Sequence, residues 1–125
     1  MTEQIEDICS DLFYLSETDA EVRPFFGGSM QNGVRETVIK NVDAKSEKTI
    51  EEISLDSVFS RLKTIHDRSG ENENVVKSVE LRKLLEKNLK DLIVLRFGRI
   101  QIDIYVVGVD AEGNLAGIRT TAVET

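Results

Sequence analysis

Apolar residues recur at helical spacing in three stretches of the chain. The first stretch predicts an amphipathic helix over residues 3–15, with Thr2 as its N-cap. The second predicts a helix over residues 55–62 with Ser54 as its N-cap, because four apolar residues there lie at i, i+3, i+4 and i+7. The third predicts a helix over about residues 74–90.

Short apolar runs and alternation of apolar and polar residues predict strands elsewhere. The clearest case is residues 100–109, where the isoleucines face one way, and Asp103 and Tyr105 the other. Pro24 removes a backbone donor, so its strand belongs at a sheet edge, and Gly98-Arg99 resembles a hairpin turn. The other predicted strands are residues 22–26, 34–42, 50–53, 92–97 and 115–123.

The order of these elements indicates one α+β domain spanning residues 1–125, with helices covering a mostly antiparallel sheet. The best strands carry apolar residues on both faces near their middles, so we expect helices on both faces of the sheet. Residues 65–74 are polar and predict an exposed loop longer than the usual connection.

Charge narrows the classes of partner. Sixteen Lys and Arg against twenty-three Asp and Glu give a net charge of −7. Such a chain repels phosphates and anionic lipid heads, which argues against binding to nucleic acid or membranes. It suits a basic protein partner. A single cysteine excludes an internal disulfide, and the absence of a signal-like start or a long apolar run indicates a cytoplasmic protein.

The residues offer little catalytic chemistry, and no cofactor is expected. His66 and Asp67 resemble a general-base pair, but neighbouring residues seldom orient each other and these lie in a polar loop. Cys9 falls on the apolar side of a predicted helix, where a buried structural thiol is expected. Asp103 has no second carboxylate that the sequence places beside it. The acidic residues 17–21 lack the spacing of a calcium loop, so they indicate a solvated loop.

Several segments from about residue 55 onward together indicate a family, and the most specific of them is Gly-Asn-Leu-Ala-Gly-Ile with the Val-Glu-Thr end. They are Leu55-Asp56-Ser57-Val58-Phe59-Ser60-Arg61, Lys83-Leu84-Leu85-Glu86 with Asn88-Leu89-Lys90, Asp103-Ile104-Tyr105-Val106-Val107-Gly108, Gly113-Asn114-Leu115-Ala116-Gly117-Ile118, and the final Val123-Glu124-Thr125. Together they resemble the nuclease A inhibitor (NuiA-like) family. The resemblance implies an α/β/α sandwich like that of the plant PR-1 proteins.

The resemblance also implies a function and a set of contact residues. Family members block a sugar-non-specific DNA/RNA endonuclease that holds Mg²⁺ and arginines in its active site. The family's final Thr, whose hydroxyl reaches that Mg²⁺, corresponds to Thr125, and a Glu that pairs with a nuclease Arg corresponds to Glu17. An Asp after the second helix corresponds to Asp67. Glu124 is added as a neighbouring carboxylate. A free inhibitor of this type is expected to be a monomer.

Two other functions remain open from the sequence. One is a binding module for an unrelated basic protein, which would use the acidic surface and be indifferent to the C-terminal residues. The other is an enzyme that uses Asp103 or His66, which requires a turnover that is lost when either residue is replaced.

Overall fold

Strands dominate the part of the chain that the computed structural model describes, which is residues 2–9, 12–15, 19–29, 33, 50–64 and 71–123. The helices of this part are α1 (Thr2–Cys9), α3 (Leu55–Phe59) and α4 (Glu71–Asn88). Its strands are β1 (Leu12–Leu15), β2 (Asp19–Glu21), β3 (Arg23–Ser29), β4 (Ile50–Ile53), β5 (Leu62–Thr64), β6 (Lys90–Phe97), β7 (Gln101–Val109) and β8 (Asn114–Val123).

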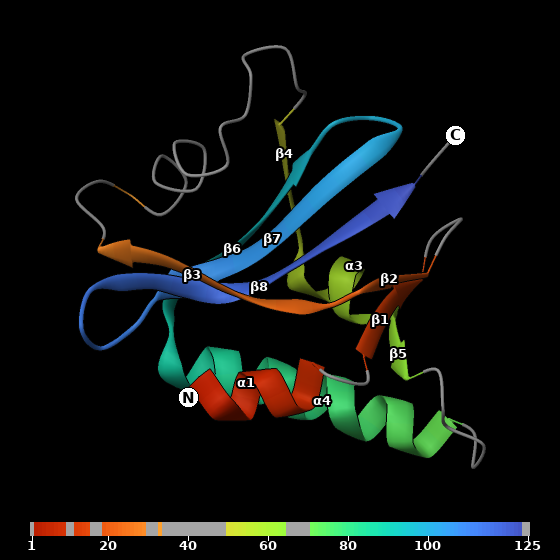
Figure 1. The fold of residues 1–125 in the computed structure, drawn as a ribbon, viewed down its shortest axis with the longest axis horizontal. Helices are drawn as coiled ribbons and strands as arrows, with labels where there is room; N and C mark the ends of the chain where they lie inside the picture. Colours follow the sequence, from red (N-terminus) through yellow and green to blue (C-terminus); the bar gives the residue numbers. More distant parts are fainter. Residues whose placement is uncertain are drawn as a thin grey trace.

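The described strands form two antiparallel sheets. The larger has five strands in the order β3-β8-β7-β6-β4, and the smaller has three in the order β2-β1-β5. Strands β6, β7 and β8 follow one another as a meander, while β3 is added beside β8 from the other end of the chain. The C-terminal strand β8 therefore lies inside the sheet, between β7 and β3 (Figure 1).

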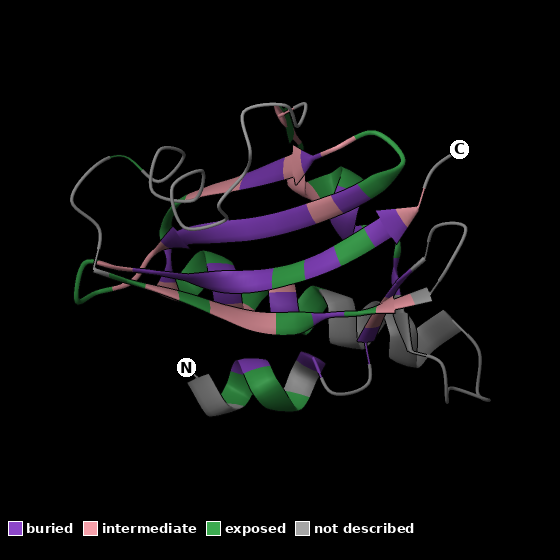
Figure 2. Cartoon of the chain, turned by 45° about the horizontal axis from the view of Figure 1, so that its top comes forward, coloured by how far each residue is buried: buried purple, intermediate pink, exposed green. Residues whose placement is uncertain are grey.

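One face of the large sheet packs on the helices. Its alternate residues, including Ile102 and Ile104 of β7 and Ile118 of β8, share a core with Ile5 of α1 and Leu81 of α4, and all five side chains are at most 1% exposed. Figure 2 shows these buried positions running along β7 and β8. The alternation that the sequence shows in residues 100–109 thus selects the face that meets the helices.

The opposite face of the large sheet carries a second apolar cluster, built around aromatic rings. Tyr105 lies edge-on to Phe25, with ring centroids 5.1 Å apart, and to Phe97 at 5.7 Å. Leu95 and Phe97 in this cluster are fully buried. Gly117 lies directly between Phe25 and Val107 in the register of three strands, and a Cβ at this position would overlap the backbone of β7.

The expected α/β/α sandwich is wrong. All three described helices contribute to the first core, and none of them contributes to the second. Figure 1 likewise shows α1 and α4 together on one side of the large sheet. The molecule is mostly antiparallel β-sheet, as every described strand pair is antiparallel. Apolar residues on both faces were correctly inferred, but within the described residues the second face is packed by the sheet's own aromatic and aliphatic side chains.

The predicted helix over residues 3–15 is also wrong in its second half. The helix α1 ends at Cys9, and residues 12–15 form strand β1, which pairs with β2 and β5. Leu12 and Tyr14 are buried while Phe13 is half-buried, a period of two. Cross-strand pairing on both sides of β1 outweighs the helical spacing that the same residues allow.

The remaining predicted elements fare better. Ser54 caps α3 as predicted, accepting a hydrogen bond from the Ser57 backbone N–H at 3.2 Å. Strands close to residues 22–26, 50–53, 92–97, 100–109 and 115–123 are confirmed, and Pro24 lies in an edge strand. Helix α4 begins at Glu71, earlier than predicted, and Leu62 belongs to β5 rather than to α3. The predicted strand over residues 34–42 lies outside the described residues.

Helices α3 and α4 share the first core, and a polar contact made by Arg82 also links them. The guanidinium of Arg82 on α4 donates hydrogen bonds to Asp56 of α3 and to Glu86 one turn further along α4. The same guanidinium lies over the ring of Phe59, 5.9 Å from its centroid. These contacts hold α3 against α4, and β5 lies between the two helices in the sequence.

Candidate functional site

The four residues carried over from the resemblance, Glu17, Asp67, Glu124 and Thr125, lie outside the described residues. The structure instead defines the points at which the chain enters and leaves their segments. These points show which of the candidate residues are attached to the same end of the fold.

The segment containing Glu124 and Thr125 follows directly from an interior strand. Val123, the last residue of β8, is paired with Gln101 at the start of β7. Among the described residues the pairing of β8 with β3 ends at Arg119, so the end of β8 is held by its pairing with β7 and by the hydrogen bond from Thr120 to the Glu21 carbonyl of β2. Residues that follow Val123 therefore start from a well-defined position, which favours a role that requires accurate placement.

The connection containing Glu17 is attached at the same end of the molecule. Strands β1 and β2 form a hairpin in which Leu15 pairs with Asp19, so residues 16–18 are its connection. The sequence placed Glu17 in a loop that leaves a helix, whereas the structure places it between two strands. The hairpin is fastened to β8, because the Thr120 hydroxyl donates a hydrogen bond to the Glu21 carbonyl oxygen at 3.0 Å. In Figure 1 the hairpin and the end of β8 lie on the same side.

The segment containing Asp67 is attached at the opposite end of the small sheet. Strand β5 runs antiparallel to β1, and its last residue Thr64 lies beside Leu12, the first residue of β1. Residues 12 and 15 are separated by about 10 Å along a strand. The attachments of Glu17 and Thr125 therefore lie on the same side of the molecule (Figure 1), and that of Asp67 lies at the opposite end of the small sheet from that of Glu17.

A pocket of about 590 Å³ lies on the large sheet close to the end of β8, and sequence reasoning missed it. It is formed where β2 and β3 meet β8 and β7. Its lining residues are Ala20, Glu21, Arg23, Asp103, Tyr105, Arg119, Thr120 and Thr121. Cross-strand pairing explains the cluster, because Tyr105 lies opposite Arg119 and Asp103 opposite Thr121.

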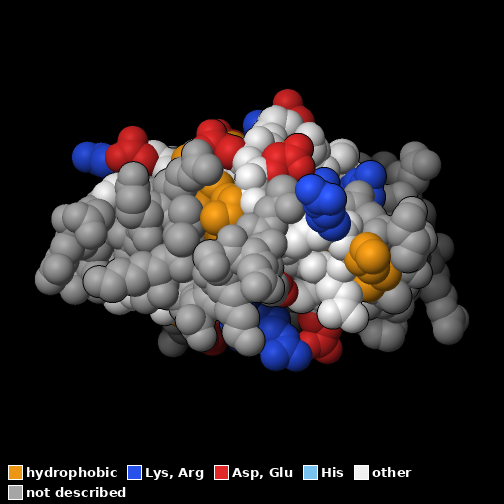
Figure 3. Space-filling view, turned by 90° about the horizontal axis from the view of Figure 1, so that it is seen from above, with side chains coloured by type: hydrophobic (Ala, Val, Ile, Leu, Met, Phe, Trp, Pro, Cys, Tyr) orange, Lys and Arg blue, Asp and Glu red, His pale blue; other side chains and the backbone are white. Residues whose placement is uncertain are grey.

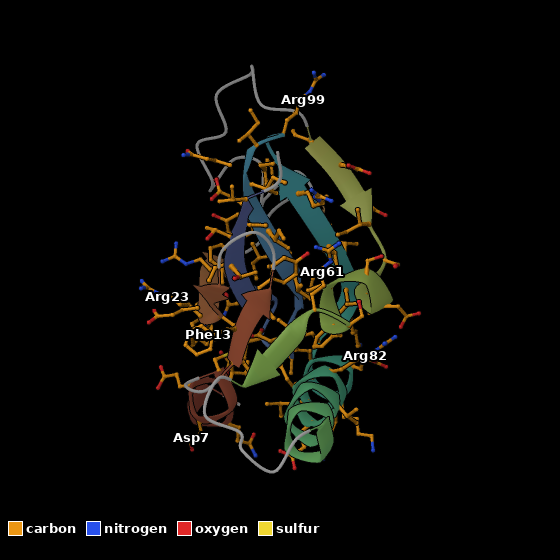
Figure 4. All side chains as sticks on the ribbon, turned by 90° about the vertical axis from the view of Figure 1, so that its right-hand side faces the viewer. Asp7, Phe13, Arg23, Arg61, Arg82 and Arg99 are labelled. Atoms are coloured by element: carbon orange, nitrogen blue, oxygen red, sulfur yellow. The ribbon has the colours of Figure 1, made fainter. Side chains whose placement is uncertain are left out.

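The charges of the pocket are mixed. Glu21 and Arg23 form an ion pair of 2.9 Å, with both side chains more than 60% exposed, so the pair contributes little stability. Arg119 is exposed and lies directly opposite Arg23 on the neighbouring strand. Figure 4 shows Arg23 projecting outward from the β3 side of the molecule. In the view of Figure 3, acidic and basic side chains are likewise interspersed.

The candidate catalytic residues gain no support. Burial raises the pKa of the Cys9 thiol to about 12, and its side chain is 4% exposed, so it is a structural residue rather than a nucleophile. Asp103 is half-buried beside the pocket, and His66 lies outside the described residues. Among the described residues, no group of three or more His, Cys, Asp or Glu side chains could hold a metal ion.

The strand ends, the hairpin and the mixed-charge pocket together favour a protein-binding domain. The comparisons with known proteins make the class specific. A family model described as nuclease A inhibitor-like protein (NuiA) matches residues 1–125, and the chain belongs to this family. A search of curated proteins found no significant match.

None of the described helices is both long and apolar enough to cross a bilayer.

Proposed function

We propose that this protein binds and inhibits a sugar-non-specific, Mg²⁺-dependent DNA/RNA endonuclease, protecting the cell that makes it. The observation that carries the proposal is the match of the inhibitor family over residues 1–125. The net charge of −7 supports it, since an enzyme that cleaves phosphodiesters presents a basic cleft to which an acidic protein is attracted.

In the proposed complex, Thr125 enters the active site of the nuclease. Its hydroxyl is an oxygen donor, which is the type of ligand that Mg²⁺ accepts. Val123 is paired with Gln101, so Thr125 lies two residues beyond the paired strand. Two residues span at most about 7 Å, so Thr125 stays close to the end of β8. Glu124 would face the basic wall of the cleft.

Two further carboxylates complete the proposed contact. Glu17 pairs with a nuclease arginine from the β1–β2 hairpin, which is fastened to β8 through Thr120. Asp67 acts from the segment after β5, whose attachment lies at the other end of the small sheet. The inhibitor would therefore contact the nuclease along one side, with Thr125 near one end of the contact.

The proposal is tested by titrating the untagged protein against a purified sugar-non-specific nuclease of the same organism. The readout is cleavage of DNA and of RNA in Mg²⁺ buffer. We expect stoichiometric inhibition that is lost when residues 124 and 125 are deleted or when a C-terminal tag is added. Glu17→Gln is expected to weaken binding about 30-fold or more, as for one partner of a buried interfacial charge pair. Asp67→Asn is expected to act in the same direction.

The matched control is Glu112→Gln. Glu112 is exposed in the turn that precedes β8, at the opposite end of that strand from Val123, and the change removes the same charge. Its binding should equal that of the wild type apart from a small effect on association rate at low salt. Absence of inhibition by the wild type would refute the proposal. Inhibition that survives the C-terminal tag would instead favour a binding module that does not use Thr125.

A further inference from the structure

Two arginines face each other across neighbouring strands on the outer side of the large sheet. Arg23 of β3 is directly opposite Arg119 of β8 in the register. Like charges in this position destabilise a sheet. Glu21 pairs with Arg23 at 2.9 Å, whereas within the described residues Arg119 has no ion-pair partner. The isolated protein therefore keeps an unfavourable charge pair that a substitution at Arg119 would remove.

The two arginines also line the 590 Å³ pocket. Its inner wall is the ring of Tyr105, which lies opposite Arg119 and is 9% exposed, and Thr121 supplies a hydroxyl. A carboxylate that enters this pocket meets a guanidinium able to donate two parallel hydrogen bonds, next to an aromatic surface. Burial on one side by Tyr105 would reduce the exposure of the ion pair to water, which strengthens it.

The position of the pocket links it to the proposed contact with the nuclease. Arg119 lies four residues before Val123 on the same strand, which is about 13 Å. Glu21, another lining residue, belongs to the hairpin that carries Glu17. The strands that lead to Thr125 and from Glu17 therefore also line this pocket, which favours a partner that contacts all three.

We propose that the pocket binds an Asp or Glu side chain of the nuclease, held by Arg119. The inference rests on the proposed function. It adds a contact of reversed polarity, in which the acidic inhibitor supplies the cation and the basic enzyme supplies the anion. Such a pair fixes the register of the two proteins and discriminates between nucleases that share a basic cleft.

A tethered carboxylate suits the pocket better than a free phosphate. Glu21 and Asp103 line the same pocket, and their negative charges repel a multivalent anion. A protein carboxylate brings a single charge that the rest of the interface positions next to Arg119. Other contacts between the two proteins then supply the affinity that this single pair lacks.

The test compares Arg119→Met with Lys90→Met. Lys90 is an exposed cation at the opposite end of the large sheet, where it pairs with Val109, so both variants change the net charge equally. The dissociation constant for the purified nuclease is measured by titration calorimetry, and the midpoint of thermal unfolding is measured without the nuclease. We expect Arg119→Met to weaken binding about 30-fold or more and Lys90→Met to weaken it less than about threefold. The unfolding midpoint of Arg119→Met should be equal to or above that of the wild type.

Three results would overturn the proposal. The first is inhibition by the wild type with equal binding by the two variants, which leaves the proposed function intact. The second is a lower unfolding midpoint for Arg119→Met, which would make Arg119 a structural residue. The third is stabilisation by free phosphate: 10 mM inorganic phosphate, about ten times a millimolar dissociation constant, raises the unfolding midpoint of the wild type but not that of Arg119→Met. A wild type that does not inhibit refutes the proposed function itself.

Discussion

The hydroxyl of Thr120 joins the two sheets, and its removal should be measurable. Thr120 is 6% exposed, and its hydroxyl donates to the carbonyl oxygen of Glu21 at 3.0 Å. Thr120→Val keeps the size and branching of the side chain but leaves that carbonyl without this donor. Losing a typical hydrogen bond costs about 0.5–1.5 kcal/mol, and leaving a fully buried acceptor unsatisfied costs about 1–3 kcal/mol; this bond is part-buried, and the extra buried methyl offsets a part of its loss. We expect the free energy of unfolding to fall by about 1–2 kcal/mol.

Urea unfolding monitored by circular dichroism measures this change, and thermal unfolding provides a second readout. For a chain of 125 residues, 1 kcal/mol corresponds to about 4 °C in the unfolding midpoint, so a decrease of about 4–8 °C is expected. Thr121→Val is the matched control, because Thr121 is the next residue of β8 and is exposed. Its change should stay within about 0.5 kcal/mol.

The same variant also tests how the Glu17 hairpin is held. If β2 is fastened to β8 through Thr120, then Thr120→Val loosens the hairpin and weakens binding to the nuclease. This reasoning would be refuted if Thr120→Val lowered the free energy of unfolding by less than about 0.5 kcal/mol, or if Thr121→Val lowered it by as much as Thr120→Val does.

Three further predictions concern the core and the helix contacts. Gly117→Ala should lower the free energy of unfolding by about 3 kcal/mol or more in urea titrations, because the added Cβ would overlap a backbone carbonyl of β7; a loss below about 1 kcal/mol would contradict this. The Cys9 thiol should not react with Ellman's reagent at pH 8 until urea unfolds the protein. Because its pKa is raised to about 12 from 9.0, stability should fall as the pH rises from about 9 toward 12, and Cys9→Ala should reduce that slope. Arg82→Met should lower the free energy of unfolding by less than about 1 kcal/mol, because the ion pairs of Arg82 are partly exposed. Urea unfolding at low and high salt measures this change, and Lys83→Met is the control.

The strand pattern of the C-terminal half could be predicted because one period dominates there. In residues 100–109 the isoleucines alternate with polar and aromatic residues, and both faces of β7 follow that alternation. Residues 12–15 are different, because a short apolar run satisfies helical and strand spacing equally. Only their pairing with β2 and β5, which are supplied by other parts of the chain, decides between the two.

The candidate site shows the same limit. The family segments led to Glu17 and Thr125 by position in the sequence, and the structure added that their attachments lie at one end. The pocket could not be predicted in this way. Arg23 and Arg119 are 119 − 23 = 96 residues apart, and only the register between β3 and β8 shows that they are neighbours. Nothing in the local sequence of either arginine indicates the other.

The same pairing has a consequence for how the protein reaches its folded state. Among the described strands β3 pairs only with β8 in the large sheet, so this pairing cannot form until a residue 96 positions further along the chain is available. Bringing such distant segments together costs loop-closure entropy before any contact compensates for it, which slows folding. We expect refolding in milliseconds to seconds by stopped-flow fluorescence, with the β3 edge and the pocket beside it forming last. During synthesis the Glu17 hairpin would precede its fastening to β8, and the binding surface would be completed only after that strand has joined the sheet.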